Sequence, residues 1–549
     1  MTALDDLADR YVDEFAALDP CRAAMMGIAG QDARLTDYAP DGFAARADLS
    51  RRTLSELAAT PVEGERDRVA AGVLRERLRV ELALEDAKVN DSFLDTTDGP
   101  VQRLRQAVEV LDTGAATDWD AVLGRLEALP GTLSGLQVSL ARAREDGRVS
   151  ARRQVVGNAE ESRQVPAYLT GLAERAGEGP LGGALRKAAE AAGRAWAEFA
   201  AFLDAEVAPH APGKDALGAE RYRLGVQEFL GTHLDLAETY QWGWEELARV
   251  EAQMAAAAEQ VLPGQGVAAV RAALDADPAH RLPGAQAFRD WIQELAERAM
   301  ADLDGVHFDI PRRLRTIDCR LTPVASGIYY LAPAEDGSRP GTVWWSLDRA
   351  QEEVVTWSVP ATMFHEGAPG HHLQLGTTTF NTATLNRFQR TACEFFPGHC
   401  EGWGLYAERL MDELGLYADP GHRFGMWAGG QQFRAARVIV DIGMHLELEI
   451  PKGTGFHEGE RWTPQLGLEF LGLHSGPDLA PQLQFEIDRY LGRPAQAIAY
   501  KVGEKAWLEL REEARGRAGA AFDLKDFHRT ALDLGPMGLD MLRDELARA

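Results

Sequence analysis

A segment near residue 370 combines three histidines and one glutamate within eight residues, although the whole chain has only 13 histidines. A catalytic zinc ion needs three protein ligands and one coordination position open to water. A glutamate next to the first histidine can then accept a proton from that water. The segment therefore predicts a zinc hydrolase site with a glutamate as general base. It reads His365-Glu366-Gly367-Ala368-Pro369-Gly370-His371-His372-Leu373-Gln374.

The spacing departs from the regular helical zinc motif, in which two histidines four residues apart share one face. Here Pro369 stands four residues after His365. On an ideal helix His371 would lie about 240° around the axis, and His372 about 10 Å along it. Proline removes a helical hydrogen bond and glycine permits unusual dihedral angles, so Pro369-Gly370 predicts a helix break. We expect the break to return His371 to the position of the second ligand, with His372 as the alternative ligand or a supporting donor.

The third ligand should come from a separate helix and be a histidine or a carboxylate. Glu401 is the best candidate, and His399 is a weaker one. Glu408 lies on the same face seven residues later, so it could orient a ligand through a hydrogen bond. The alternative is that Glu401 is a surface residue on an amphipathic helix.

Arg434, Arg437, Asp441 and His445 are spaced by three, four and four residues, so they share one helical face among apolar neighbours. Charged side chains on a buried helix must face partners, a cleft or water, because unpaired buried charge is costly. We expect this face to line the site. Arg434 or Arg437 would bind a substrate carboxylate, Asp441 would orient its neighbours, and His445 would stabilise a developing oxyanion. A salt-bridge network that only stabilises the fold is the alternative.

Two tyrosines and one turn arginine complete the set of candidate residues. Zinc peptidases stabilise the tetrahedral intermediate with the metal and a tyrosine or histidine donor. We expect Tyr500 to be such a donor and Tyr490 to contact the substrate, with buried structural tyrosines as the alternative. Arg339 lies in a glycine-flanked turn, where it could clamp the substrate or simply be exposed.

The elements that must position these residues are mainly helices. The first three hundred residues are rich in Ala, Leu, Glu and Arg with helical spacing of the apolar residues, for example over 185–207 and 234–261. Helical patterning returns near residue 358, where Ser358 could cap a helix that has Pro360 in its first turn.

Between these helical regions the pattern favours short strands. A glycine- and proline-containing turn at 336–341 separates the last two runs and predicts a hairpin or meander. A short sheet beside the metal-motif helix matters because an edge strand can bind a peptide backbone. The β-prone runs are 306–310, 316–319, 328–331 and 342–345.

The predicted fold is therefore mainly α: a large helical protein with a small β-sheet next to the metal-motif helix. We expect an N-terminal helical region over 1–304 and a catalytic region over 305–549. The small sheet occupies 305–357 of the latter, and the metal-motif helix with the following helices occupies 358–549. The two regions are expected to form one continuous fold.

Charge and composition exclude several classes of partner. Lys and Arg number 58 against 85 Asp and Glu, giving a formal charge of −27 that repels phosphate backbones and anionic lipid. We therefore expect neither nucleic acid nor membrane as partner. The N-terminal segment is acidic where a signal peptide is basic, and the chain has no run of about 18 apolar residues. Four cysteines are too few for a disulfide framework. These features predict a cytoplasmic location; oligomerisation is compatible with the sequence but not indicated by it.

The two motifs together, HExxPGHHLQ from His365 and EGWxLYAE from Glu401, resemble those of the bacterial domain-of-unknown-function 885 family, whose members look like gluzincin metallopeptidases. Gly404 stands where a small residue such as Ala is expected. The resemblance covers at least residues 325–505. It implies a largely helical, gluzincin-like fold with a deep cleft, one zinc ion held by two histidines and a glutamate, and hydrolysis of peptide or related amide bonds. Related HExxxGH-like carboxypeptidase motifs also favour His371 over His372.

The sequence thus predicts a zinc-dependent hydrolase, most directly a metallopeptidase acting on short peptides. One alternative is a pathway-specific amidase or tailoring hydrolase that uses the same zinc on a non-peptide metabolite. The other is a helical binding protein with a degenerate site. The complete set of ligands and base argues against the latter, because loss of function usually removes one of them.

Overall fold

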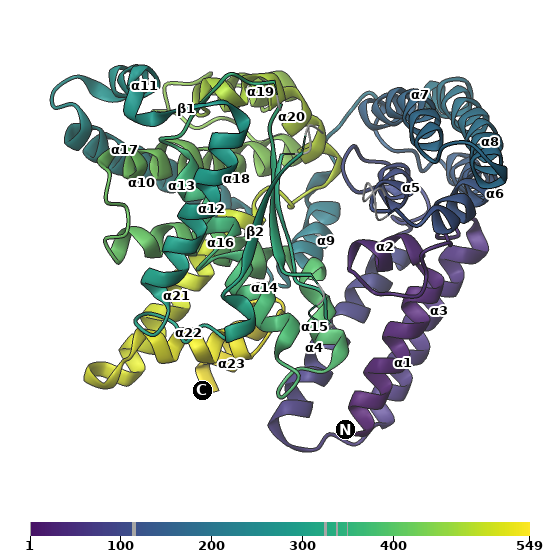
Figure 1. The fold of residues 1–549 in the computed structure, drawn as a ribbon, viewed down its shortest axis with the longest axis horizontal. Coiled ribbons are helices and arrows are strands. Elements are labelled where there is room, and N and C mark those ends of the chain that lie inside the picture. The colour runs from purple at the N-terminus through teal and green to yellow at the C-terminus, as the bar shows by residue number, and fades with distance from the viewer. Residues whose placement is uncertain are drawn as a thin grey trace. The chain divides into compact units, whose positions relative to one another are not determined.

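The computed structural model describes residues 2–111, 117–322, 327–335, 337, 339–348 and 350–548. The protein is mainly helical with small sheets, which confirms the predicted fold class at that level (Figure 1). The chain divides into two compact units. Unit 1 comprises Met1–Leu217 and Gln484–Arg493, and unit 2 comprises Gly218–Leu483 and Pro494–Ala549.

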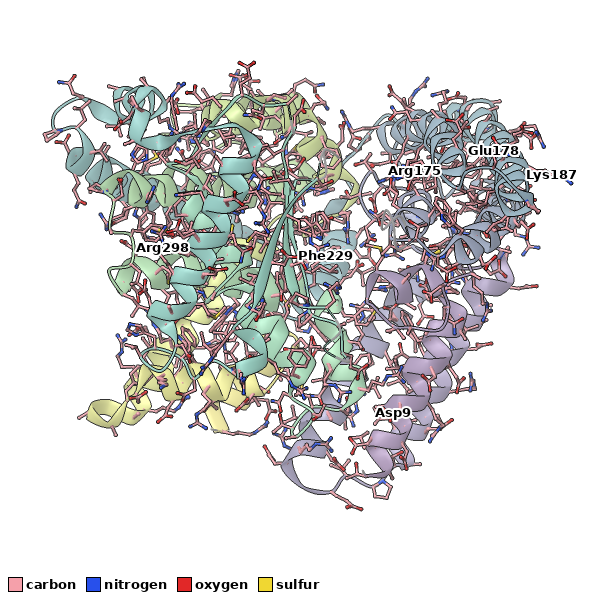
Figure 2. The ribbon with its side chains drawn as sticks, in the orientation of Figure 1. Asp9, Arg175, Glu178, Lys187, Phe229 and Arg298 are labelled. Carbon is pink, nitrogen blue, oxygen red and sulfur yellow. The ribbon has the colours of Figure 1, made fainter. Side chains whose placement is uncertain are left out.

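Unit 1 is built from helices around an apolar core. Trp196 and Phe199 of α8 are fully buried in this core with leucines of α6 and α7. Charged side chains at the α7–α8 end, Arg175, Glu178 and Lys187, are exposed to solvent (Figure 2). The helix predicted over 185–207 is present, with its last turn in π geometry. The helices are α1 (Ala3–Leu18), α2 (Pro20–Met25), α3 (Pro40–Ala59), α4 (Gly64–Asp86), α5 (Pro100–Glu109), α6 (Trp119–Glu145), α7 (Arg152–Arg175), α8 (Pro180–Phe202), η2 (Leu203–Val207), η3 (Ala208–His210) and α20 (Leu483–Gly492).

Unit 2 contains the remaining helices and all strands of the described chain. The helix predicted over 234–261 is confirmed as α10. Within the described residues, no helix combines the length and apolar content needed to cross a bilayer. The longer helices are α9 (Gly218–Leu230), α10 (Leu236–Val261), α11 (Gly266–Ala276), α12 (Gly284–Leu303), α13 (Val359–Glu366), α14 (His371–Phe380), α16 (Pro397–Glu413), α18 (Gln432–Leu446), α19 (Pro464–Leu473), α21 (Ala499–Ala518), α22 (Leu524–Asp533) and α23 (Leu539–Arg548). Short helical segments are η4 (Pro278–His280), η5 (Arg312–Leu314), α15 (Arg387–Thr391), η6 (Ala392–Phe395), α17 (Pro420–Gly425), η7 (Met426–Gln431), η8 (Pro477–Gln482) and η9 (Gly519–Ala521).

Two small sheets lie in unit 2. In the larger, with order β2-β4-β3, β2 (Ile317–Thr322) runs parallel to β4 (Gly341–Ser346), and β3 (Ile328–Leu331) pairs antiparallel with β4. The smaller sheet pairs β1 (Arg281–Pro283) with β5 (Glu353–Val355). The antiparallel β3–β4 pair confirms the predicted hairpin. One apolar cluster joins the sheet to α12 and α13, with Phe288, Val343 and Met363 among its members. The small sheet therefore packs beside the metal-motif helix, as predicted.

Two expectations about the middle of the chain differ from the structure. The run 306–310 is not a strand, because the backbone N–H groups of residues 306, 307 and 308 all donate to Leu303 O at the end of α12. These bonds satisfy a helix C-terminus and leave the segment as a turn. The change in pattern near residue 305 falls inside unit 2, since α9 to α12 belong to the same compact unit as the sheet.

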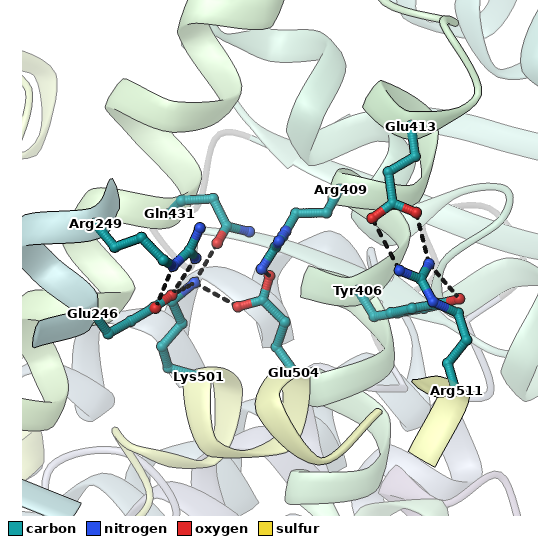
Figure 3. A network of polar contacts seen from close by, with 9 residues as sticks. All are labelled: Glu246, Arg249, Tyr406, Arg409, Glu413, Gln431, Lys501, Glu504 and Arg511. Carbon is teal, nitrogen blue, oxygen red and sulfur yellow. Dashed lines mark hydrogen bonds and ion pairs between the residues drawn. The ribbon is translucent and has the colours of Figure 1, made fainter. Parts of the chain in front are cut away.

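A buried polar network fixes α21 to its neighbours (Figure 3). Lys501, which is fully buried, contacts Glu246 of α10 at 2.8 Å and Glu504 of its own helix at 2.5 Å, and it also donates to Gln431. Arg249 donates two hydrogen bonds to Glu246, at 2.7 and 2.6 Å. The network pairs each buried charge with an opposite one, which is the condition for burying charge at tolerable cost.

Glycines allow α16 and α21 to approach each other closely. A Cβ atom placed on Gly402 would lie 2.4 Å from the carbonyl carbon of Gly503, and one on Gly503 would lie 2.7 Å from Cα of Gly402. Real Cβ atoms do not approach other atoms so closely, so only glycine fits this crossing. The crossing brings the start of α16, with Glu401, near the start of α21, with Tyr500.

Candidate metal centre

The metal-motif helix breaks where the sequence predicts. Helix α13 ends at Glu366 and α14 begins at His371, with a cis peptide bond between Ala368 and Pro369. A Cβ atom on Gly370 would lie 1.9 Å from the carbonyl oxygen of His365, so a side chain cannot be accommodated there. Ser358 occupies the N-cap position of α13 but makes no side-chain capping bond.

The break brings the three predicted ligands together. His365 Nε2 lies 3.1 Å from Glu401 Oε2, and His371 Nε2 lies 3.6 Å from the same oxygen. The two imidazole rings meet edge to face with centroids 4.7 Å apart. One donor atom from each residue lies within 4.8 Å of the others. Two imidazoles and one carboxylate at this separation could hold a metal ion, and zinc is among the ions that such donors bind.

Glu408 supports the first histidine from behind. Its Oε1 lies 2.9 Å from His365 Nδ1, and the side chain is almost completely buried. A hydrogen bond from Nδ1 fixes the ring so that Nε2 faces the centre. Gly404 makes this contact possible, because a Cβ atom there would lie 2.5 Å from the His365 ring. The glycine at this position thus lets the ring pack directly against the backbone of α16.

The carboxylates around His365 stabilise positive charge on its imidazole ring. Burial alone would lower the pKa of His365, but hydrogen bonds with Glu401 and Glu408 outweigh it and raise the pKa to about 10. Burial likewise tends to raise the pKa of Glu401, but the two histidines hold it well below its usual value. Both shifts mean that the buried carboxylates retain a positive charge beside them.

Glu366, the predicted general base, is buried next to these ligands with 8% of its surface exposed. Burial raises the pKa of its carboxyl group, against the lowering influence of His371, His365 and Arg434. A carboxylate with a raised pKa is a stronger base, which suits proton transfer near neutral pH.

Three further predicted residues lie at this centre. The Tyr500 ring stacks near the His365 ring, with centroids 6.4 Å apart and an interplanar angle of 27°. The guanidinium groups of Arg434 and Arg437 lie 5.7 and 5.1 Å from the centre of the Tyr500 ring. Helix α18 therefore contributes two positive charges beside the tyrosine.

His372 has a different position. Its Nδ1 lies 2.9 Å from the Tyr330 hydroxyl on β3, and its Nε2 lies 2.7 Å from Leu314 O in η5. Both ring nitrogens are therefore engaged away from the centre, and burial lowers the pKa of the ring. His372 anchors α14 to the sheet, and His371 is the histidine that joins His365 and Glu401.

Two other predicted residues, Asp441 and His445, lie close to each other on α18. Asp441 Oδ2 accepts hydrogen bonds from the Tyr222 hydroxyl at 2.6 Å and from Ala495 N at 3.0 Å, in the interior where His445 lies 3.8 Å away. Asp441 thus links α18 to α9 and to the segment before α21.

Arg339 and Tyr490 are bound to their local surroundings. Arg339 donates to the backbone carbonyls of Ala332 at 2.7 Å and Pro340 at 3.2 Å, within the loop between β3 and β4. Tyr490 belongs to unit 1, where its hydroxyl donates to Glu486 at 2.5 Å.

Two positioning residues were not assigned a role from the sequence. Trp403 is fully buried, and its indole N–H donates to Pro369 O at 2.8 Å, so it holds the broken segment against α16. Tyr330 holds His372 from the sheet. Trp403 could have been found from its place two residues after Glu401, because the indole N–H of a buried tryptophan usually needs a hydrogen-bond partner nearby. No comparable signal marks Tyr330.

Comparison with known families assigns the chain to one of them. The model of the family described as "Bacterial protein of unknown function (DUF885)" matches residues 20–546. The chain belongs to this family. No curated protein matches the chain.

Two solved structures share the fold. One is a candidate lipoprotein from Colwellia psychrerythraea, with TM-score 0.83 and 20% identity over 100% of this chain and 99% of that one. The other is a candidate lipoprotein from Shewanella oneidensis, with TM-score 0.75 and 16% identity over 100% of both chains. At these identities the likeness concerns the fold alone.

Proposed function

We propose that this DUF885 protein is a zinc-dependent hydrolase, and most directly a metallopeptidase that cleaves peptide or amide bonds of short peptides. The observation that carries the proposal is the convergence of His365, His371 and Glu401 donor atoms within 4.8 Å, beside the buried Glu366. A purely structural role explains this cluster less well. Burying carboxylates and imidazoles destabilises the folded state unless a cation compensates their charge.

The residues fit a single zinc ion. His365, His371 and Glu401 would be its ligands, and Glu408 already orients the first of them through the bond to Nδ1. Bound zinc would polarise the scissile carbonyl and make its water more acidic.

The chain's own residues would carry the proton and the charges. Glu366 would accept the proton of the attacking water and pass it to the leaving nitrogen. Tyr500 is preferred over His445 as the oxyanion donor, because its ring lies beside His365, whereas His445 lies beside Asp441. Arg434 and Arg437 would bind a carboxylate of the substrate.

Two variants test the proposal. We expect Glu366→Gln to retain zinc and lose at least 100-fold in turnover, because the amide cannot accept the proton. We expect His365→Ala to lose zinc, because one ligand and the orienting contact disappear together. Metal content by mass spectrometry and cleavage of a mixed peptide library measure both. Full activity in Glu366→Gln would sink the assignment, and cleavage only of non-peptide amides would reassign the substrate class.

We further propose a cytoplasmic location, which the low cysteine content of the sequence favours. The two similar structures are described as candidate lipoproteins, a class that is anchored to membranes. Fractionation of cells that express the native gene decides the point: recovery in the soluble cytoplasmic fraction supports the proposal, and recovery with membranes contradicts it.

A further inference from the structure

A second cluster of metal-ligating side chains lies in unit 2 and uses none of the residues of the candidate centre. His280, Asp419 and His422 each offer one donor atom, and these atoms lie within 4.8 Å of one another. Among the described residues, this cluster and the centre at His365 are the groups of three that reach such proximity. Nothing in the proposed hydrolase activity requires it.

The three residues come from two distant parts of the chain. His280 ends η4, directly before β1, and is 5% exposed. Asp419 is the N-cap of α17, and His422 lies one turn into that helix. Asp419 Oδ1 accepts the capping bond from Gly421 N at 2.7 Å. The cap therefore uses one carboxylate oxygen and leaves Oδ2 on the side of His280.

The distances suit a shared ion better than a hydrogen bond. His280 Nε2 lies 3.7 Å from Asp419 Oδ2, beyond the usual range of about 2.7–3.2 Å for a hydrogen bond. Ligands at about 2.0–2.1 Å from a tetrahedral zinc ion lie roughly 3.3–3.5 Å from each other. The imidazole rings of His280 and His422 meet edge to face, with centroids 5.4 Å apart and an interplanar angle of 67°. In the described part of the chain, neither imidazole forms a hydrogen bond.

Gly421 keeps the space between the donors open. A Cβ atom on this residue would lie 3.1 Å from His280 Nε2 and 3.1 Å from Asp419 Oδ1. It would also lie 2.8 Å from a methyl carbon of Leu274, so the neighbours would have to move. Glycine at position 421 is thus the one residue type that leaves the donor atoms of His280 and Asp419 accessible to a ligand.

We propose that His280, Asp419 and His422 form a second site for a divalent transition-metal ion of the zinc type, with water as the remaining ligand. Two imidazoles and a carboxylate favour such ions over calcium or magnesium, which take oxygen ligands. The ion would tie the segment before β1 to the start of α17. The backbone oxygen of His280 also accepts from Thr356 N at 2.9 Å, three residues before α13. The site therefore stabilises the segment that leads into the metal-motif helix.

Zinc stoichiometry in matched variants tests the site. We expect two zinc ions per chain in the unaltered protein and one in His422→Ala, by mass spectrometry and calorimetric titration. Asp419→Asn should weaken the second site at least 10-fold while keeping the helix, because asparagine caps as well as aspartate. His210→Ala, which removes an exposed histidine of unit 1, should leave both ions bound.

A second measurement separates this site from the candidate catalytic centre. We expect His365→Ala/His371→Ala to bind one zinc ion and to gain thermal stability when zinc is added, since the ion binds only the folded protein. Adding His422→Ala should remove both the ion and the gain. The proposal is overturned if the unaltered protein and His422→Ala bind the same number of ions, or if zinc leaves the stability of the double variant unchanged. If only the hydrolase assignment fails, the unaltered protein lacks the ion that depends on His365 but still binds the ion that depends on His422.

Discussion

At the scale of single residues, Glu408 determines how His365 presents its nitrogen to an ion. We expect Glu408→Gln to weaken zinc binding about 10–100-fold, because a neutral amide holds the ring less firmly and does not support the positive charge. Competition with a chromophoric chelator measures the affinity. Glu413→Gln on the same helix is the matched control, since Glu413 pairs with Arg511 and not with the centre. Equal affinities in the two variants would contradict the orienting role.

Arg434 is expected to set the acidic limb of the activity profile. Burial raises the pKa of Glu366 above its ordinary 4.5, and the Arg434 charge opposes that rise. The base acts only when deprotonated, so kcat/KM falls as the pH falls through its pKa. Arg434→Met removes a lowering influence, so the limb should move to higher pH. Arg312→Met, at an exposed residue of η5, should leave the limb in place. An unshifted limb in Arg434→Met would show that the guanidinium does not act on the base.

At the scale of elements, α21 depends on Lys501 for its attachment. We expect Lys501→Met to cost about 3–5 kcal/mol, because Glu246 and Glu504 lose the buried cation that they share, and Arg249 and Arg409 then neutralise them only from the outer side. Since Tyr500 precedes Lys501, activity should fall with it. Urea denaturation followed by circular dichroism gives the free energy of unfolding. Lys505→Met, at a side chain 42% exposed on the same helix, should cost less than about 1 kcal/mol. Similar costs for both variants would rule out the anchoring role.

The elements also show which parts of the site the sequence could predict. The break at Pro369-Gly370 follows from local rules of helix geometry, so it could be predicted from the sequence. Glu401 could be named only as a candidate, because it lies on the separate helix α16 and reaches His365 and His371 through tertiary packing. Spacing alone does not distinguish Asp441 from a site residue. Its carboxylate nevertheless accepts a hydrogen bond from Tyr222, which lies more than two hundred residues earlier. Such a partner depends on tertiary packing. The run 306–310 has the composition of a strand, but its first three backbone N–H groups donate to the carbonyl of Leu303 at the end of α12.

At the scale of the whole molecule, two buried histidines predict sensitivity to acid. Burial lowers the pKa of His399 and of His528 to about 3, against 6.5 in the unfolded chain. The unfolded state therefore binds more protons, and stability present above pH 6.5 is lost as the pH falls toward 3. Each group contributes about 1.4 kcal/mol per pH unit in that window.

Urea titrations at several pH values between 4 and 7 measure this slope. His528→Gln should lose roughly one histidine's share of it, about 1.4 kcal/mol per pH unit. His210→Ala, at an exposed position, should keep the full slope. A slope that is unchanged in His528→Gln would mean that the ring is already protonated in the folded protein.

The division of the chain into two units could not be predicted from the sequence, for a related reason. Helices α9 to α12 have the same composition as the helices of unit 1, so pattern alone groups them with the N-terminal half. Their assignment to unit 2 comes from their contacts, for example Tyr222 of α9 with Asp441 of α18. Likewise α20 lies late in the chain but belongs to unit 1.

The contact between Gly402 and Gly503 has a consequence for how the activity can diversify. With no side chain between α16 and α21, no substitution can act as a spacer to move Tyr500 away from Glu401. We expect new substrate preferences to arise instead at Arg434 and Arg437 of α18, whose guanidinium groups lie over the Tyr500 ring. A library randomised at those two arginines should yield altered specificities, whereas one randomised at the two glycines should yield mostly unfolded chains.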